Sequence, residues 1–140
     1  MHARCSRSTN MVYSAITKTG GNTGLTLRPK DQRVSQFDID TKVTQTNDHI
    51  WSGTLSKSWN IGTNPNGGYL LSCVLSALKL ALPHSDPITV TTHYLRPGTA
   101  GEPFEVHVSV IRTGRTLSTA RASLIQAGKV RLEVLAGFGD

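Results

Sequence analysis

Two adjacent glycines precede the most apolar stretch of this chain, and their backbone amides are its first candidate for chemistry. The segment Pro65–Tyr69 leads into a run from Leu70 to Leu82 in which Lys79 is the only charged residue. A glycine pair at a helix start leaves N–H groups that no side chain shields, at the positive end of the helix dipole. Such amides can polarise a carbonyl group or bind an anion. An alternative is that the glycines are there to allow a tight turn from strand to helix. The two interpretations are compatible with each other.

The apolar run predicts a buried helix over residues 67–82 that Pro83 ends. A Thr/Val-rich segment at 42–46 and a second segment at 50–55 predict a β-hairpin ahead of it. After the helix, alternating apolar and polar residues separated by short turns predict four further strands, at 88–95, 104–112, 117–126 and 130–138. We expect these last four strands to form an antiparallel meander or nearly so, because the turns are too short for crossovers.

One apolar helix and one antiparallel sheet have few ways to pack. A flat sheet would cover only one stripe of the helix, so the sheet has to curl around it. The predicted fold class is therefore α+β, specifically the hotdog fold, in which an antiparallel sheet wraps around one long central apolar helix.

The chain has 140 residues and a formal net charge of +6, which fits one domain. Residues 1–36 carry +5 of this charge and residues 37–140 only +1. We place the folded domain at 37–140, and its near neutrality argues against nucleic acid as a partner. Residues 1–36 are rich in Ser, Thr, Gly and Arg, which predicts a disordered or targeting-like N-terminal extension. No stretch is long and apolar enough to predict a membrane span.

The two cysteines lie in very different surroundings. Cys5 belongs to the N-terminal extension and Cys73 to the apolar run. We interpret Cys73 as a small buried hydrophobe, which suits a reducing compartment. The predicted location is the cytoplasm, with the mitochondrial or peroxisomal matrix as alternatives.

No Cys-x-x-Cys pair or closely spaced His/Cys set occurs, so no metal site is predicted. Neither a Gly-x-Ser-x-Gly elbow nor a P-loop is found.

Four motifs in order give the chain a family resemblance: Trp59 followed by Pro65–Leu70, then Thr91–Gly98, Val110–Thr116 and Ala122–Gly128. With them, residues 37–140 resemble the thioesterase-like superfamily of TesB-type acyl-CoA thioesterases, and more closely the N-terminal hotdog of their double-hotdog chains. The resemblance implies acyl-CoA as a small-molecule substrate in lipid metabolism and hydrolysis by water without a covalent intermediate. It implies no cofactor, since CoA is part of the substrate.

The resemblance also implies an incomplete catalytic site. In the family a catalytic Asp lies in the second hotdog, with Thr and Gln partners that orient water. The counterpart of that Asp would fall near Asn66–Gly68, where no carboxylate occurs. Gln126 matches the Gln, and Thr92 or His93 could supply the hydroxyl or imidazole counterpart. This chain would then hold half a catalytic site, or a scaffold half.

The amides of Gly67, Gly68 and Tyr69 are the predicted oxyanion hole of such a site, beside Asn66 as a substrate-binding residue. Gln126 either orients water or bonds to a backbone group at the end of its strand. His93 is suited to act as a general base at neutral pH, although a lone strand His is more often a surface residue.

Basic residues near the turns are the predicted CoA contacts. Arg112 and Arg115 bracket a hairpin turn, and Arg96 follows the strand that carries Thr92. Arginine binds phosphate groups through two hydrogen bonds at once. The alternative is that these arginines only keep exposed turns solvated.

Three functions stay open on this sequence. The first is an acyl-CoA thioesterase that forms a homodimer or a higher homo-oligomer. The homodimer would imitate the double hotdog, with an acyl chain between the helix and the partner. The second is a non-catalytic acyl-CoA-binding or scaffold half that lacks the catalytic Asp. The third is a hotdog enoyl-CoA hydratase or dehydratase, which would use His93 with an acid from another chain.

Overall fold

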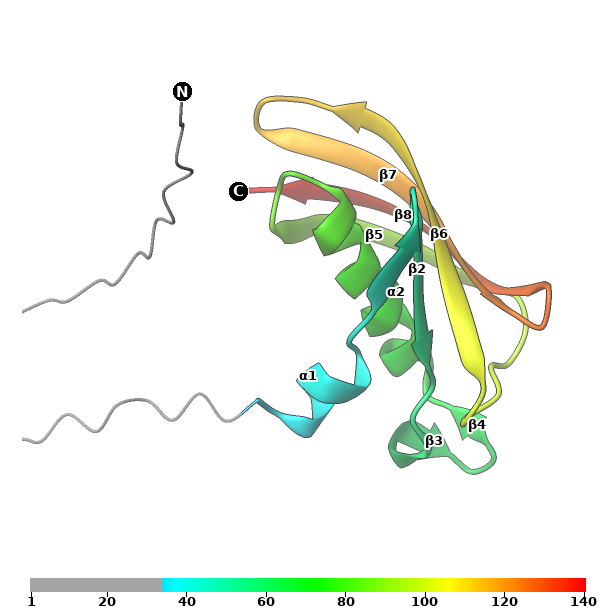
Figure 1. Ribbon diagram of the computed structural model, residues 1–140. Helices are drawn as coiled ribbons and strands as arrows, with labels where there is room; N and C mark the ends of the chain where they lie inside the picture. The colour runs from blue at the N-terminus through cyan, green and yellow to red at the C-terminus, as the bar shows by residue number, and fades with distance from the viewer. Residues whose placement is uncertain (1–33) are drawn as a thin grey trace, which may run out of the picture. The chain divides into compact units, whose positions relative to one another are not determined.

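The computed structural model describes residues 34–140, so Cys5 and nearly all of the predicted extension 1–36 lie outside the described residues. Along the described chain (Figure 1) the elements are α1 (Gln36–Asp40), β1 (Thr44–Asn47), β2 (Ile50–Thr54), the 3₁₀ helix η1 (Lys57–Trp59), β3 (Asn60–Ile61), β4 (Asn64–Pro65), α2 (Gly67–Ala81), β5 (Asp86–Tyr94), β6 (Pro103–Thr113), β7 (Leu117–Gln126) and β8 (Lys129–Gly139).

Six strands form one antiparallel sheet in the order β1-β2-β6-β7-β8-β5. The predicted hairpin of β1 and β2 and the meander of β6, β7 and β8 are confirmed. The meander prediction is wrong for β5, which pairs with β8 at the sheet edge. The loop 95–102 between β5 and β6 crosses three strand spacings, about 14 Å. Eight residues can span up to about 27 Å, so the connection is longer than a hairpin needs.

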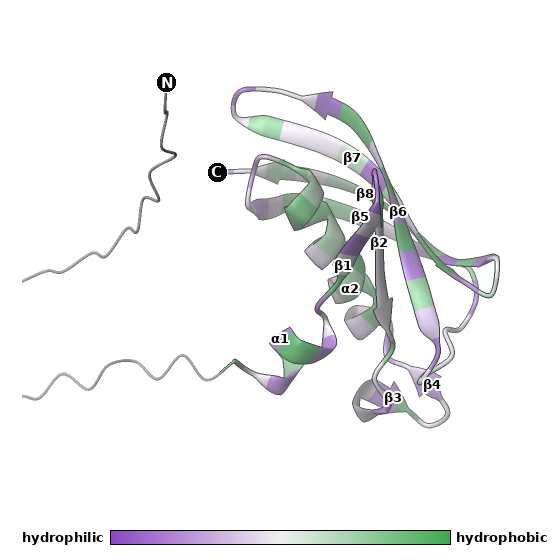
Figure 2. Cartoon of the chain, viewed as in Figure 1, coloured by the Kyte–Doolittle hydropathy of each residue, from purple (hydrophilic) through white to green (hydrophobic). Residues whose placement is uncertain are grey.

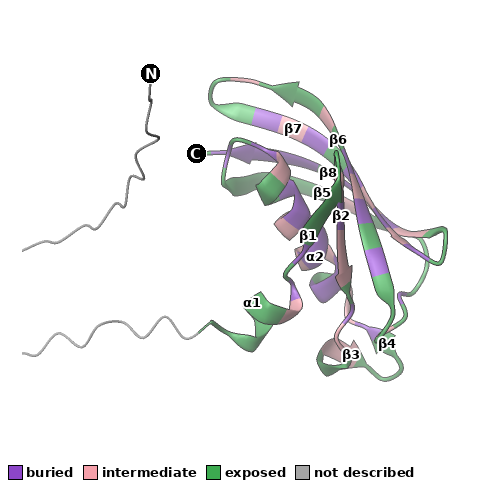
Figure 3. Ribbon diagram, in the orientation of Figure 1, coloured by how far each residue is buried: buried purple, intermediate pink, exposed green. Residues whose placement is uncertain are grey.

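The sheet curls around α2 (Figure 1), as the predicted α+β architecture requires. The inward residues of the three central strands are almost all buried, and they are Phe104, Val106 and Val108 on β6, Ala120, Ala122 and Leu124 on β7, and Leu132, Val134, Ala136 and Phe138 on β8. Figures 2 and 3 show the matching alternation of hydrophobic with hydrophilic and buried with exposed residues along these strands. Alanines on β7 and β8 leave room for the helix.

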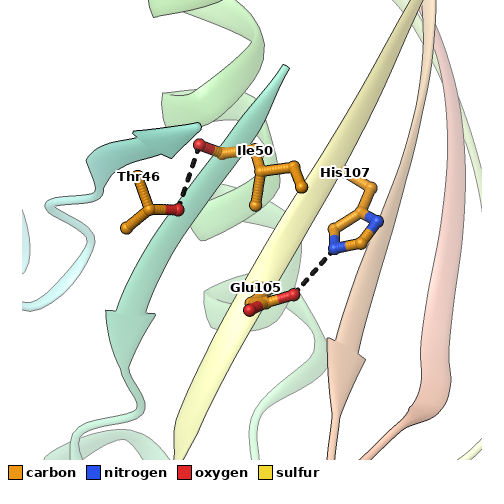
Figure 4. Close-up of polar contacts among 4 residues, drawn as sticks. All are labelled: Thr46, Ile50, Glu105 and His107. Carbon is orange, nitrogen blue, oxygen red and sulfur yellow. Dashed lines mark hydrogen bonds and ion pairs between the residues drawn. The ribbon is translucent and has the colours of Figure 1, made fainter. Parts of the chain in front are cut away.

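Polar side chains occupy the outer face of β6. Glu105 and His107 lie on the same side of the strand, and the His107 Nε2 atom is 2.8 Å from a Glu105 carboxylate oxygen (Figure 4). The same view shows Thr46 on β1, whose hydroxyl donates to the Ile50 carbonyl at 3.4 Å across the first hairpin. Both side chains are largely accessible to solvent, at 42% and 56% exposure, so this contact contributes little to stability.

Helix α2 is the predicted apolar helix. It ends where Leu82 turns to extended backbone ahead of Pro83. The residues that it buries are Tyr69, Leu70, Cys73, Val74, Ala77 and Leu78, and Cys73 is a free buried thiol, as predicted. No helix among residues 34–140 is long and apolar enough to cross a membrane.

Helix α1 and the β3–β4 ribbon were not predicted. Five residues are too few for α1 to show a helical period, but its N-terminus has a capping box in which Ser35 and Asp38 bond to each other's backbone N–H groups. The β3 and β4 strands have two residues each, below the length at which alternation can be read.

Burial on α2 sets the stability of the fold. Replacing Leu78, which is fully buried, by Ala should lower the free energy of unfolding by about 2–5 kcal/mol, because it removes apolar contacts and leaves a cavity. The matched control is Leu80→Ala on the same helix, where the side chain is 62% exposed; it should change stability by less than about 1 kcal/mol. Urea denaturation of both variants measures the difference, and equal losses would contradict this packing.

Candidate functional site

The start of α2 is set by the loop that precedes it. Asn66 is the N-cap residue. Its backbone N–H donates to the Trp59 carbonyl at 2.8 Å, and its side-chain oxygen accepts from the Gly68 N–H at 2.7 Å. The prediction that the Gly68 amide is free is therefore wrong, because Asn66 caps it. The side-chain oxygen of Asn66 thus serves as a helix cap, and its predicted substrate-binding role stays a prediction.

Two predicted donors remain at this helix start. Within residues 34–140 no hydrogen bond engages the N–H groups of Gly67 and Tyr69, whereas the Leu70 N–H donates to the Asn66 carbonyl at 3.1 Å. Unpaired N–H groups in the first turn carry the partial positive charge of the helix dipole. They are suited to hydrogen-bond a carbonyl oxygen or an anion.

A cavity of about 340 Å³ lies against this first turn. It is lined by Pro65, Gly67, Leu70, Tyr94, Leu95, Arg96 and Pro97. Among residues 34–140, Arg96 is the one charged residue in this lining, and its Nη1 atom donates to the Val130 carbonyl at 3.2 Å. In the described part of the chain the cavity therefore combines an apolar wall, a helix start and one guanidinium group, and its lining holds no carboxylate.

Tyr94 closes one side of this cavity and was missed by the sequence analysis. Its hydroxyl donates to the Gly67 carbonyl at 3.1 Å. A Cβ atom on Gly67 would lie 3.0 Å from the Tyr94 ring, so glycine at this position lets the ring approach the helix start without shifting. The period-two alternation of the strand could have found it, because Tyr94 follows Thr92 by two residues and so lies on the same face. In the structure Tyr94 pairs with Leu132 and the half-buried Thr92 with Val134, which places both on the helix side of β5.

The side chain of Tyr69 anchors the helix start to α1. Its hydroxyl accepts from the Ser56 N–H and donates to the Asp40 carbonyl, both at 2.9 Å. Trp59 stacks near the Tyr69 ring and donates its indole N–H to the Asp40 carboxylate at 2.8 Å. Burial raises the pKa of Tyr69 to about 12, while the Trp59 hydrogen bond lowers the pKa of Asp40. Tyr69 is thus neutral and Asp40 ionised at neutral pH, which keeps this network intact.

Gln126 is buried at the end of β7, and its amide bonds to the 95–102 loop. Its side-chain oxygen accepts from the Thr99 N–H at 2.8 Å, and its nitrogen donates to the carbonyls of Thr99 at 3.0 Å and Glu102 at 3.3 Å. Of the two roles predicted for Gln126, these contacts support the backbone-bonding one.

His93 faces away from the helix start. It pairs with Glu133 on the outer face of the sheet, where Arg121 and Leu135 line a hollow of about 180 Å³ with it. Since side chains on adjacent strand residues point to opposite faces, His93 cannot reach the cavity beside Gly67 within one chain. The general-base prediction therefore fails in the single chain, and the hydratase alternative loses its base there. Among residues 34–140 no three His, Cys, Asp or Glu side chains are grouped to hold a metal ion.

Arg112 and Arg115 lie at the opposite end of α2 from Arg96. They flank the β6–β7 hairpin, and the Arg115 carbonyl is 3.2 Å from a ring nitrogen of His84, just after the C-terminus of α2. The helix has 15 residues, so about 22 Å separates its two ends. Within one chain the structure does not bring the three predicted phosphate-binding arginines together.

Comparison with known proteins adds a family match. A family model described as the acyl-CoA thioesterase N-terminal domain matches residues 55–139. The thioesterase-like protein TwmA of Talaromyces wortmannii is 34% identical over 94 residues, which are 66% of this chain and 27% of that protein.

Solved structures show the same fold. A candidate thioesterase II from Thermobifida fusca YX is 28% identical with a TM-score of 0.71, over 74% of this chain and 38% of that one. A hypothetical thioesterase with coenzyme A from Streptococcus pneumoniae TIGR4 has a TM-score of 0.60 at 17% identity, over 71% of this chain and 84% of that one. A hotdog-fold protein from Alicyclobacillus acidocaldarius gives 0.65 at 23% identity, over 74% of this chain and 39% of that one. The fold is the hotdog fold. The chain spans about a quarter of TwmA and two fifths of the Thermobifida protein.

The thiol one turn beyond Tyr69 gives a pH test of this buried region. Burial raises the pKa of Cys73 from 9.0 to about 12, so the unfolded chain loses this proton at lower pH than the folded one. Its contribution to stability is complete below pH 9 and falls as the pH rises toward 12, by up to about 1.4 kcal/mol per pH unit. In urea titrations under reducing conditions, the stability gap between wild type and Cys73→Ala should narrow above pH 9. A gap that stays constant to pH 10.5 would contradict a buried neutral thiol.

Proposed function

Because this chain belongs to the acyl-CoA thioesterase N-terminal domain family, we propose that it binds acyl-CoA thioesters at the start of α2 and takes part in their hydrolysis. Water would attack the thioester carbonyl, and no covalent enzyme intermediate would form. The observation that carries the proposal is the cavity beside Gly67, where the Gly67 amide, which has no hydrogen-bond partner among residues 34–140, and Arg96 lie next to an apolar wall. CoA acts in this proposal as part of the substrate and not as a cofactor.

The amides of Gly67 and Tyr69 are the proposed oxyanion-stabilising groups. As water adds to the thioester carbon, negative charge develops on the carbonyl oxygen, and donors already fixed at a helix start stabilise that charge without reorganising. The Asn66 cap and the Tyr69 network support this role, since they hold the first turn in place. Losing one oxyanion-hole donor typically costs about 10²–10³ in kcat.

The CoA leaving group carries phosphates, and Arg96 on the rim of the cavity is the proposed contact. The Streptococcus pneumoniae neighbour was solved with coenzyme A, which supports CoA as the ligand class. Arg112 and Arg115 are proposed to act from a second subunit or domain, because they lie a helix length away in this chain.

Among residues 34–140 no strand pairs with the outer edge of β5, and this edge supports such a partner. All nine residues are exposed or half-buried, including Ile88, Val90 and Tyr94, and an uncovered edge of this length favours pairing with another strand. Antiparallel pairing of two β5 strands would bring the β6–β7 hairpin of one copy to the α2 start of the other, because β5 begins beside Gly139 and Leu117 at the hairpin end. We propose a homodimer of this kind, with the acyl chain between α2 and the partner.

A second function is favoured by one specific observation. Among the residues that the structure describes, the lining of the cavity contains no Asp, Glu or His, so residues 34–140 supply no general base there. In this alternative the chain is a non-catalytic acyl-CoA-binding or scaffold half, and the base belongs to another domain. Thiol release from a panel of acyl-CoAs, measured alongside CoA binding by calorimetry, separates the two: saturable binding without turnover supports the second function.

Arg96 gives the sharpest test of the ligand. Arg96→Ala should weaken CoA binding about tenfold or more, because a charge-assisted hydrogen bond to phosphate is worth about 1.5–3 kcal/mol. Arg121→Ala is the matched control, since Arg121 is exposed on the outer face of the sheet and its loss removes the same charge. Calorimetric titration with CoA measures both variants, and equal affinities in the two would contradict the proposed contact.

The edge-strand partner has its own test. Light scattering on the wild-type chain should give the mass of a dimer, and Val90→Lys in β5 should give a monomer, because a lysine at the seam would bury an unpaired charge. Ile111→Lys is the control, since Ile111 is 60% exposed and lies on β6, away from the edge. A wild-type monomer, or a dimer that survives Val90→Lys, would contradict pairing through β5.

A further inference from the structure

The wall of the cavity opposite Gly67 is a loop rather than a strand. Residues 95–102 join β5 to β6, and Leu95, Arg96 and Pro97 from this loop line the cavity. Irregular backbone has no ladder partners, so its polar groups need other partners to be held in one conformation. The position of Arg96 at the cavity therefore depends on what fixes this loop.

Backbone contacts fix the two ends of the loop. The N–H groups of Leu95 and Arg96 both donate to the Arg131 carbonyl, at 2.8 and 3.1 Å, and the Gly101 N–H donates to the Leu55 carbonyl at 2.6 Å. Between these points lies the buried Gly98, where an added Cβ would sit 3.2 Å from Leu55 and 3.3 Å from Leu70. The centre of the loop thus packs closely on the core, and an added methyl group at Gly98 would require the side chains of Leu55 and Leu70 to shift by a few tenths of an ångström.

Gln126 supplies the hydrogen bonds at that centre. It is 2% exposed and makes three bonds to loop backbone, one with the Thr99 N–H and two with the carbonyls of Thr99 and Glu102. Among residues 34–140 it is the only side chain that bonds to the backbone of this loop. Both N–H groups of its amide have acceptors, and Gln126 is not among the residues that line the cavity.

We propose that Gln126 is a positioning residue that sets the affinity of the α2 cavity for the anionic part of CoA. It does so by holding the centre of the 95–102 loop against the core, which keeps the exposed Arg96 at the rim of the cavity. A glutamine that orients the attacking water needs a free amide atom aimed into the cavity, whereas here the nitrogen and the oxygen both bond to the loop. This inference rests on the proposed function for the identity of the ligand, but the contact between Gln126 and the loop can be tested without it.

The test compares Gln126→Met, which keeps the length of the side chain and removes all three bonds, with the wild-type 140-residue chain. Gln45→Met is the matched control, since Gln45 is exposed on β1. Three quantities are measured in each protein: hydrogen exchange of the Thr99 amide by NMR, the Kd for CoA, and kcat for a hydrolysed acyl-CoA. We expect Thr99 exchange to be at least about tenfold faster, the Kd to rise about tenfold, and kcat to stay within about threefold, with no change in Gln45→Met.

Two results would overturn the proposal. The first is unchanged Thr99 exchange in a folded Gln126→Met, which would show that the loop does not need this side chain. The second is a loss of kcat beyond about 100-fold with unchanged exchange and Kd, which would make Gln126 a catalytic residue. A wild-type chain that fails to bind CoA would contradict the proposed function, and the exchange measurement alone would then decide whether Gln126 holds the loop.

A second variant covers the case in which Gln126→Met does not fold. Gly98→Ala leaves Gln126 in place and presses a methyl group between the loop and the leucines beneath it. It should also speed Thr99 exchange and weaken CoA binding. Wild-type values for both quantities in Gly98→Ala would overturn the proposal.

Discussion

The burial of α2 within the curved sheet is the contact on which the rest of this structure depends. An apolar helix with one charged residue has to be covered along most of its length, and a sheet meets that need only by curling. Alanines on β7 and β8 make the close approach possible, and Phe104 and Phe138 are buried in the same core. Because the helix is fixed by this packing, its first turn is presented at a defined place at the edge of the sheet.

The helix start is divided between structural and chemical uses. The Asn66 side chain accepts a hydrogen bond from the Gly68 N–H and so caps the helix. The N–H groups of Gly67 and Tyr69 make no hydrogen bond within the described chain. Two supports hold this arrangement from different sides: the Asp40–Trp59–Tyr69 network ties the turn to α1, and Gln126 ties the opposing loop to β7. The apolar wall and Arg96 then offer a ligand one apolar and one charged surface to contact.

The elements that bury long alternating runs could be predicted from the sequence. Residues 104–112, 117–126 and 130–138 alternate with period two, and the helix over 67–82 is apolar around most of its circumference. These elements could be predicted because the apolar pattern that burial requires is written in their residues. The place of β5 could not be predicted, because pairing partners depend on where a loop crosses and not on the strand's own residues. The Asn66 cap depends on one hydrogen bond, and the orientation of His93 depends on strand register. Residue types alone determine neither. The resemblance supplied Gln126, but only the backbone of Thr99 and Glu102 shows what its amide contacts.

The most direct measurement is the ¹H–¹⁵N NMR spectrum of the chain with and without a non-hydrolysable acyl-CoA thioether. If the start of α2 binds the acyl carbonyl, the amide resonances of Gly67 and Tyr69 will move in proportion to saturation, while that of Gly68, already bonded to Asn66, will move least. Shifts confined to the outer face around His93 and Glu133, or no shift at Gly67 and Tyr69 at saturating ligand, would contradict the account.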